Sequence, residues 1–253
     1  FIDESGKNWD YFDISGNSYS MTLDQTTLNE MRANGFIIGG HDYTVTGITV
    51  EAAGTVKYDF YAAKNDFTLD DAVTEGTWAN RFMKSDLEKI TPYLLQLQQA
   101  GIPVLWRPLH EAAGKWFWWG NGSAASYVKL WRTMYNFFKQ KGINNLIWVW
   151  TSEGNDAAWY PGDEYVDIIG SDVYGKDGVA VSAEQMAERF NSLAYRYPTK
   201  MISLTECGTV TDIPAQWKGD AQWSWFMPWY GGTHATDDWW KAAMNSEDVI
   251  TRN

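Results

Sequence analysis

Short apolar runs alternate along this chain with longer amphipathic segments, and this alternation constrains the fold more than any other feature. The apolar runs, each of strand length, span residues 8–14, 36–43, 102–109, 145–151, 166–174, 201–206 and 223–229. The segments with apolar residues spaced by three and four span residues 21–34, 84–100, 124–141 and 183–196. Strands that alternate with helices predict an α/β fold in which helices cover a parallel sheet.

The length of the chain favours one barrel over an open sheet. Its 253 residues match the size of a single (β/α)8 TIM barrel. No linker divides them, so we expect residues 1–253 to form a single catalytic barrel domain. The runs are one too few for eight strands, so the first strand is expected to be missing, misread or upstream of this numbering. An open doubly wound sheet is the alternative, but its glycine-rich phosphate turn is absent. Residues 43–80 are expected to form a functional loop over the third strand.

The amino-acid composition limits the classes of ligand that suit this chain. The chain has 16 tryptophans, and aromatic residues make up 16% of it, which suggests a cleft lined by rings. The net charge of -12 disfavours nucleic acid and anionic membranes and suits a neutral substrate. No apolar run is long enough to span a membrane. The chain begins at Phe1 rather than at methionine, so we expect that an upstream segment was removed, either as a cleaved signal or by editing of the sequence. We expect a secreted or extracytoplasmic protein. We also expect a monomer.

Ionisable residues stand at the C-terminal ends of the apolar runs. In a barrel these strand ends converge on one mouth, where active sites lie. The residues are His41 and Asp42, His110 and Glu111, Glu153, Asp172 and Tyr174, and Thr205 and Glu206. The run before Glu111 continues into a glycine-flanked loop with four aromatic residues at 116–119, and rings beside carboxylates are suited to holding sugars.

Glu111 and Glu206 form the best catalytic pair. Two carboxyl groups across such a mouth suit cleavage of a glycosidic bond, with one protonated and the other ionised. His110 and the aromatic loop around Glu111 favour a raised pKa and the acid role. Arg107 and Tyr174 could keep Glu206 ionised, and Arg107 is also expected to bind substrate. A structural alternative for Glu111 is a buried glutamate paired with Arg107, with the tryptophans as core. The alternative for Glu206 is a carboxylate of the barrel interior tied to Arg107.

Other chemistries have weaker support. His41 and His110 could bind a metal together with Asp172 or the glutamates, but no HxH or HExxH spacing is present. We therefore expect no metal site and no cofactor. No GxSxG motif supports a serine nucleophile. The single cysteine, Cys207, excludes a disulfide framework, and a small buried residue is the better interpretation than a reactive thiol.

Two segments resemble glycoside hydrolase family 26, the β-mannanase family. Residues 107–120, which read RPLHEAAGKWFWWG, resemble the family's acid/base segment, and residues 204–208, LTECG, resemble its nucleophile segment. The resemblance covers most of the chain from about residue 36 and implies a barrel with Glu111 on the fourth strand and Glu206 on the seventh. A departure is Ala112-Ala113, where the family often has Met-Asn.

The resemblance also implies further site residues. His110 is expected to hydrogen-bond near the nucleophile, and Tyr174 to orient it. Trp116 and Trp229 are expected to wall the subsite of the sugar being cleaved, with His41 lining the same region. The implied function is a retaining endo-β-glycanase, most plainly an endo-β-1,4-mannanase acting on a polysaccharide or oligosaccharide. A β-1,3-xylanase, a mixed-linkage β-glucanase and a non-catalytic sugar-binding barrel stay open as alternatives.

Overall fold

The computed structural model describes residues 18–22, 36–38, 41–43, 55–64, 67–230 and 234–251, and their side chains from residue 59 onward. The chain divides into two compact units. The first unit comprises Phe1–Val104 and Ala112–Leu146, and the second comprises Leu105–Glu111 and Ile147–Asn253. Within the described residues, no helix is both long enough and apolar enough to cross a membrane.

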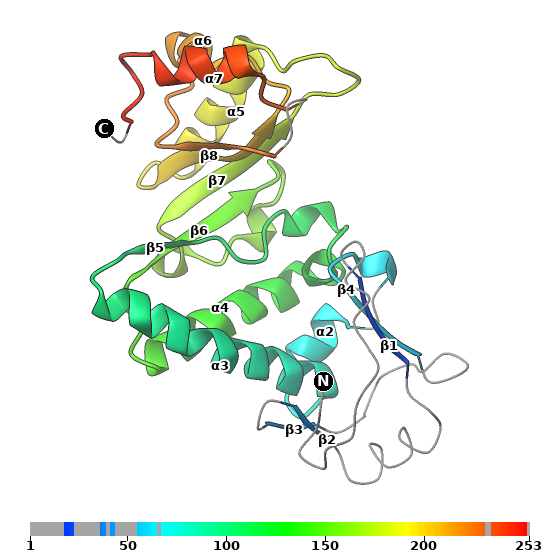
Figure 1. Cartoon of the computed structure of the whole chain (residues 1–253). Coiled ribbons are helices and arrows are strands. Elements are labelled where there is room, and N and C mark those ends of the chain that lie inside the picture. The colour runs from blue at the N-terminus through cyan, green and yellow to red at the C-terminus, as the bar shows by residue number, and fades with distance from the viewer. Residues whose placement is uncertain are drawn as a thin grey trace. The chain divides into compact units, whose positions relative to one another are not determined.

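Helices dominate the described part of the first unit. They are α2 (Leu69–Ala72), α3 (Trp78–Gln99) and α4 (Ala124–Gln140), with short 3-10 helices η1 (Ala62–Lys64), η2 (Ala112–Gly114) and η3 (Trp118–Gly120). Helices α3 and α4 lie side by side (Figure 1). They bury the apolar stripes that the sequence predicts, including Leu87 and Leu94 of α3 and Leu130 and Trp131 of α4. The predicted helices at 84–100 and 124–141 are therefore confirmed.

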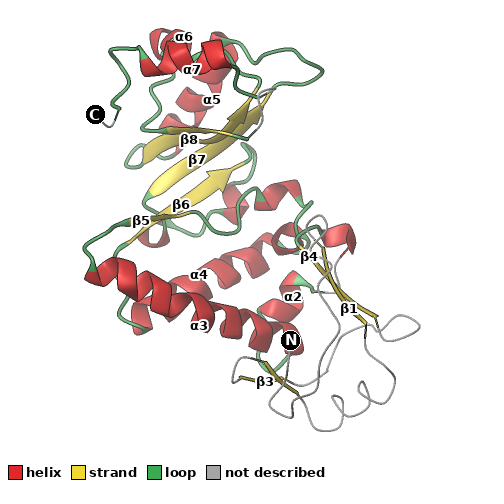
Figure 2. Ribbon diagram, viewed as in Figure 1, coloured by secondary structure: helices red, strands yellow, loops and turns green. Residues whose placement is uncertain are grey.

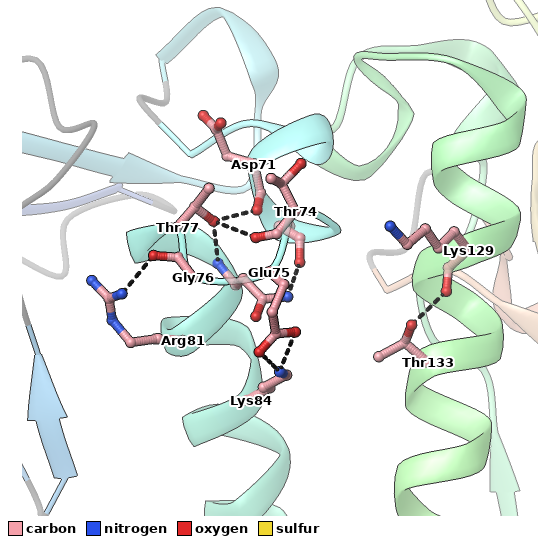
Figure 3. A network of polar contacts seen from close by, with 11 residues as sticks. Asp71, Thr74, Glu75, Gly76, Thr77, Arg81, Lys84, Lys129 and Thr133 are labelled. Atoms are coloured by element: carbon pink, nitrogen blue, oxygen red, sulfur yellow. Dashed lines mark hydrogen bonds and ion pairs between the residues drawn. The ribbon is translucent and has the colours of Figure 1, made fainter.

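Helix α3 begins earlier than predicted because a polar network caps it (Figure 3). The Thr77 hydroxyl accepts from the Asn80 N–H at 3.1 Å and donates toward the Asp71 carbonyl at 2.5 Å. The side chain of Lys84 binds Glu75 at 2.8 Å just outside the helix. A capped N-terminus satisfies backbone donors that have no partner inside the helix.

The N-terminal strands differ from the prediction. Strand β1 (Ser18–Thr22) pairs antiparallel with β4 (Thr55–Asp59), and β2 (Phe36–Ile38) pairs antiparallel with β3 (His41–Tyr43). The prediction of one parallel strand over 36–43 was wrong, because Gly39-Gly40 between the two halves is typical of a two-residue hairpin loop. The strand predicted at 8–14 and most of the helix predicted at 21–34 lie outside the described residues. Residues 43–80 hold β4, η1 and α2, and so are not a plain loop.

The second unit is built on a five-stranded sheet (Figure 2). Its strands are β5 (Val104–Trp106), β6 (Leu146–Ser152), β7 (Ile168–Tyr174), β8 (Met201–Gly208) and β9 (Phe226–Pro228). They lie in chain order, and the pairs β6–β7, β7–β8 and β8–β9 are parallel. Nearly all of β8 is buried, as expected for a parallel strand covered on both faces. The strands predicted for this part of the chain are confirmed.

Three helices accompany this sheet. They are α5 (Ala183–Arg196), α6 (Ile213–Lys218) and α7 (Asp237–Met244), with 3-10 helices η4 (Ala157–Trp159) and η5 (Asp163–Tyr165). Helix α5 contacts β8 and α6, and α6 contacts α7. Ser182 and Gln185 cap α5 reciprocally, which explains why it begins where its apolar pattern begins.

More of the tryptophans are buried in the core than the sequence suggested. The buried tryptophans are Trp78, Trp118, Trp119, Trp131, Trp148, Trp150, Trp223 and Trp239. Two of them, Trp118 and Trp119, come from the aromatic loop that we expected to line a cleft. Trp116, in the same loop, and Trp229 are each 40% exposed. The high tryptophan content therefore reflects both packing and exposed rings.

Candidate active site

Glu206 lies near the C-terminal end of β8 and is 4% exposed. Its Oε1 forms an ion pair with the Arg107 guanidinium, and its Oε2 accepts a hydrogen bond from the Tyr174 hydroxyl at 2.7 Å. A positive charge and a hydroxyl donor both stabilise a carboxylate in its ionised form. The structure thus places Arg107 and Tyr174 as the sequence analysis expected.

Asp172 on β7 joins the same cluster. The β7–β8 register shifts between Ser171 and Asp172, and this irregularity brings Asp172 opposite Glu206. The Asp172 carboxylate accepts from the Thr205 hydroxyl at 2.6 Å and from Arg107 at 3.1 Å. Gly170 allows the approach, because a Cβ atom there would lie 2.5 Å from the Thr205 side chain. Burial raises the pKa of Asp172 and outweighs the lowering effects of Arg107 and Thr205.

Arg107 connects the ends of three strands. It follows β5, and its guanidinium contacts Glu206 on β8, Asp172 on β7 and the Thr151 hydroxyl on β6, the last at 3.1 Å. Protein acceptors therefore take up this side chain, which we had expected to contact substrate. The rigid guanidinium fork suits such multiple contacts.

Glu111 occupies a strained turn just after these groups. Glu111 has φ of 53° and Leu109 has φ of 51°, a region that costs a non-glycine residue about 1–2 kcal/mol. The pKa of Glu111 is raised to about 8, first by burial and then by the charges of Asp172, Glu153 and Glu206. A hydrogen bond from protonated Glu111 to Asp172 contributes to the same shift. Glu111 therefore holds a proton at neutral pH.

His110 is neutral in this environment. Burial and the charge of Arg107 lower its pKa to about 4, although Glu206 opposes the change. Its Nε2 lies 3.7 Å from Glu206 Oε1, which is longer than a normal hydrogen bond. His110 thus stands beside the Glu206 carboxylate without adding a positive charge to it.

Tyr174 is itself held in place by its neighbours. Its ring meets the His234 imidazole edge to face, with centroids 5.7 Å apart. Gly208 leaves room for both, because a Cβ atom there would lie 2.4 Å from His234 Nδ1 and 2.8 Å from the Tyr174 ring. Burial and the Glu206 carboxylate raise the pKa of Tyr174, so its hydroxyl remains a donor.

The remaining predicted residues have different surroundings. His41 begins β3, but its side chain lies outside the described residues. Trp116 belongs to the first unit and covers Gly114, whose Cβ would lie 2.0 Å from its ring. Trp229 belongs to the second unit and packs against Tyr230, with ring centroids 5.2 Å apart. Cys207 is buried and its pKa is raised to about 12, which agrees with a packing role.

One set of described side chains has metal-ligand geometry. Ligand atoms of His110, Asp172 and Glu206 lie within 4.8 Å of one another. The guanidinium of Arg107 already contacts both carboxylates and supplies the positive charge that a metal would bring. The group is therefore explained as an ion-pair cluster.

The sequence analysis did not assign roles to several residues of this cluster. Thr151 and Thr205 carry no distinctive motif, and only the fold reveals their contacts. His234 was not considered. Asp172 had a usable signal, because it lies two residues before Tyr174 and so shares its face of the strand.

The cluster is chemically suited to bond cleavage by a pair of carboxyl groups. Glu111 retains a proton at neutral pH, whereas Glu206 is bound by a cation and a hydroxyl donor. Environments that differ in this way separate the role of acid from that of nucleophile or base.

Comparisons with known proteins agree with this geometry. The sequence profile of glycosyl hydrolase family 26 matches residues 47–250. The chain belongs to this family. Mannan endo-1,4-beta-mannosidase A of Piromyces sp is 37% identical over 179 residues, 70% of this chain and 28% of that protein. The mannan endo-1,4-beta-mannosidase of Thermothelomyces thermophilus is 37% identical over 194 residues, 76% of this chain and 38% of that protein. Endoglucanase H of Acetivibrio thermocellus is 32% identical over 98 residues, 34% of this chain and 11% of that protein.

Solved structures from glycosyl hydrolase family 26 are also similar to this chain. The GH26 domain of an endo-beta-mannanase/endo-beta-glucanase from Prevotella bryantii has a TM-score of 0.72 at 41% identity, covering 80% of this chain and 66% of that one. A beta-mannanase from a symbiotic protist of the termite Reticulitermes speratus, complexed with gluco-manno-oligosaccharide, has a TM-score of 0.68 at 39% identity. It covers 76% of this chain and 62% of that one. This chain therefore has the (β/α)8-barrel fold that its sequence predicts. It spans well under half the length of the two curated mannosidases.

Proposed function

We propose that this chain is the catalytic part of a retaining endo-β-1,4-mannanase. The observation that carries the proposal is the contrast between two glutamates in one cluster. Glu111 is protonated at neutral pH because its pKa is about 8, and Glu206 is paired with Arg107 and Tyr174. The curated relatives named above as mannan endo-1,4-beta-mannosidases support mannan as the substrate. Both glutamates are present, which argues against a non-catalytic sugar-binding barrel.

The proposed reaction has two displacement steps. Glu206 attacks the anomeric carbon while Glu111 donates its proton to the glycosidic oxygen, so the bond to the leaving chain breaks and a glycosyl ester forms. Glu111, now ionised, takes a proton from water as that water attacks the same carbon. The ester bond breaks, the sugar is released with its original configuration, and Glu206 returns to its carboxylate form. We predict carboxyl groups about 5–5.5 Å apart for this retaining route.

Neighbouring residues have proposed supporting roles. Arg107 and Tyr174 orient Glu206, and neutral His110 adjoins it. Trp116 and Trp229 are each 40% exposed, and we propose that the apolar face of a sugar stacks on them. We keep His41 as a proposed substrate contact, as the family resemblance implies.

The proposal also covers the domain organisation, the localisation and the oligomeric state of the protein. We propose one catalytic domain, since the family match runs through residues of both units. A polymer substrate cannot enter a cell freely, which supports a secreted or extracytoplasmic enzyme of polysaccharide degradation. We expect a monomer that needs no cofactor.

One substrate panel tests the proposal. Reducing-sugar release is measured on mannan, galactomannan, glucomannan, β-1,3-xylan and mixed-linkage β-glucan, and product anomers are followed by NMR. We expect activity on mannans with retention of configuration. Hydrolysis of β-glucan alone would favour the second candidate, a β-glucanase, for which the similarity to Endoglucanase H is the specific support. Inversion, or no hydrolysis of any polymer, would contradict the proposal.

A further inference from the structure

The turn after β6 is fixed by an unusual number of polar contacts. Buried Asp156 accepts from the Ser152 hydroxyl at 2.9 Å and from the backbone N–H of Glu153. The Gly154 N–H donates to the Ser152 hydroxyl at 3.1 Å. These bonds hold the backbone on both sides of Glu153.

Two arginines of α5 hold the same turn from outside it. Arg189 donates to the Ser171 hydroxyl at 2.7 Å and to the Ser152 carbonyl at 2.5 Å, and Arg196 donates to the Gly154 carbonyl. Gly154 has φ of +106°, and a Cβ atom there would lie 2.4 Å from Arg189 Nη1, so the position requires glycine. The turn therefore has one well-defined conformation.

The side chain of Glu153 does not share in this network. Its Oε1 is buried and has no hydrogen-bond partner among the described residues. The guanidinium groups of Arg189 and Arg196 donate their hydrogen bonds to the Ser171 and Ser192 hydroxyls and to backbone carbonyls instead. A glutamate with a purely structural role would be expected to have its buried oxygen satisfied, because an unmet acceptor costs about 1–3 kcal/mol.

Glu153 directly follows β6, next to the end of β7 that carries Asp172. The β6–β7 register pairs Ser152 with Ser171, so the residues that follow in parallel are Glu153 and Asp172. The groups that act on Glu153 by charge are the acids Asp172, Asp156 and Glu206 and the cation of Arg189. Glu111, in turn, lies within electrostatic range of Glu153.

We propose that Glu153 is a positioning residue of this site, whose negative charge keeps the proton on Glu111. The inference rests on the proposed function. Burial, Asp172, Asp156 and Glu206 raise the pKa of Glu153 to about 7, against Arg189, which lowers it. Glu111 has a pKa of about 8.

The other charges around Glu111 leave this role open to Glu153. Asp172 and Glu206 also raise the pKa of Glu111, but both contact the Arg107 guanidinium, which offsets their charge. His110 is neutral at working pH. Arg189 acts on Glu153 by charge, but it donates its hydrogen bonds to the Ser171 hydroxyl and the Ser152 carbonyl rather than to the Glu153 carboxylate.

The test compares two substitutions that separate charge from shape. Glu153→Gln retains the size of the side chain and removes its charge, and we expect the alkaline limb of kcat/KM on soluble mannan to move down by ~1 pH unit. Glu153→Asp retains the charge and should leave that limb closer to the wild-type position. Glu164→Gln is the matched control, because Glu164 is exposed and precedes β7, at the opposite end of the strand from Asp172. Melting temperatures are recorded for all variants.

A second measurement does not depend on turnover. The Glu111 carboxyl is titrated by carbon-13 NMR in wild-type protein and in Glu153→Gln, with its signal assigned through Glu111→Gln. A lower titration midpoint in Glu153→Gln supports the inference even if wild-type protein hydrolyses no mannan, which would refute only the proposed function. An unmoved midpoint and an unmoved alkaline limb would overturn the inference. A higher KM with an unmoved limb would also overturn it, and would indicate direct contact of Glu153 with sugar.

Discussion

Removal of the Tyr174 hydroxyl is the most direct test of how the site prepares Glu206. In the structure this hydroxyl donates a 2.7 Å hydrogen bond to Glu206 Oε2. Tyr174→Phe deletes that donor and retains the ring, which packs against His234. The substitution therefore changes one hydrogen bond and little else.

The expected magnitude follows from the type of bond that is lost. A hydrogen bond to a charged group contributes about 1.5–3 kcal/mol. If that contribution is realised in the transition state, turnover should fall about 10–100-fold.

Tyr160→Phe is a matched control for this experiment. The Tyr160 hydroxyl also donates to a carboxylate, that of Asp163, at 2.8 Å, but this hydrogen bond is exposed and lies before β7 begins. The control should keep wild-type turnover. Kinetics are measured on soluble mannan, with melting temperature as a check on folding. Wild-type turnover in Tyr174→Phe would refute the orienting role of the hydroxyl.

Other substitutions test the remaining assignments. Glu206→Ala should abolish turnover on every substrate, whereas Glu111→Ala should impair polymers far more than aryl glycosides with good leaving groups, which need little protonation; equal losses on both substrate types would exclude this division of roles. Because the pKa of Glu111 is about 8 and the acid must be protonated, kcat/KM of wild-type protein should fall as pH rises through about 8, and a profile still flat at pH 9 would contradict the assignment. Trp116→Ala and Trp229→Ala should each weaken substrate processing by about 1–3 kcal/mol without unfolding the protein, because both rings are substantially exposed; a lower melting temperature with unchanged kinetics would instead indicate packing roles.

The local hydrophobic pattern was sufficient to predict a strand or helix where burial follows a regular pattern along that element. Strands β6, β7 and β8 are buried along most of their length, so their sequences read as continuous apolar runs with recognisable ends. Helices α4 and α5 show the 3.6-residue period because one face of each is buried. Short elements are harder to recognise from the pattern of apolar residues in the sequence. The hairpin of β2 and β3 was predicted as one strand, because three residues on each side are too few to show a change of direction.

Glu111 and Glu206 could also be named as candidates from the sequence. Both lie just past apolar runs, and parallel strands bring such ends to one edge. Arg107 and Tyr174 could be named as partners of Glu206 for the same reason, although they are separated from it by 99 and 32 residues. These residues are neighbours because of the order of the strands in the sheet. The alternation of apolar runs along the sequence largely predicts that order.

Tertiary structure alone decided how these neighbours act on one another. The register shift in β7 sets Asp172 opposite Glu206, and Gly170 lets Thr205 reach it, yet neither effect has a signature in the local sequence. Burial likewise separates Trp118, which belongs to the core, from Trp116, which is exposed two residues earlier. The proton on Glu111 depends on desolvation and on the charges of three acids from other strand ends. Electrostatic energies vary with distance and burial, which the order of residues does not specify, so the sequence determined which groups meet and the fold determined their protonation.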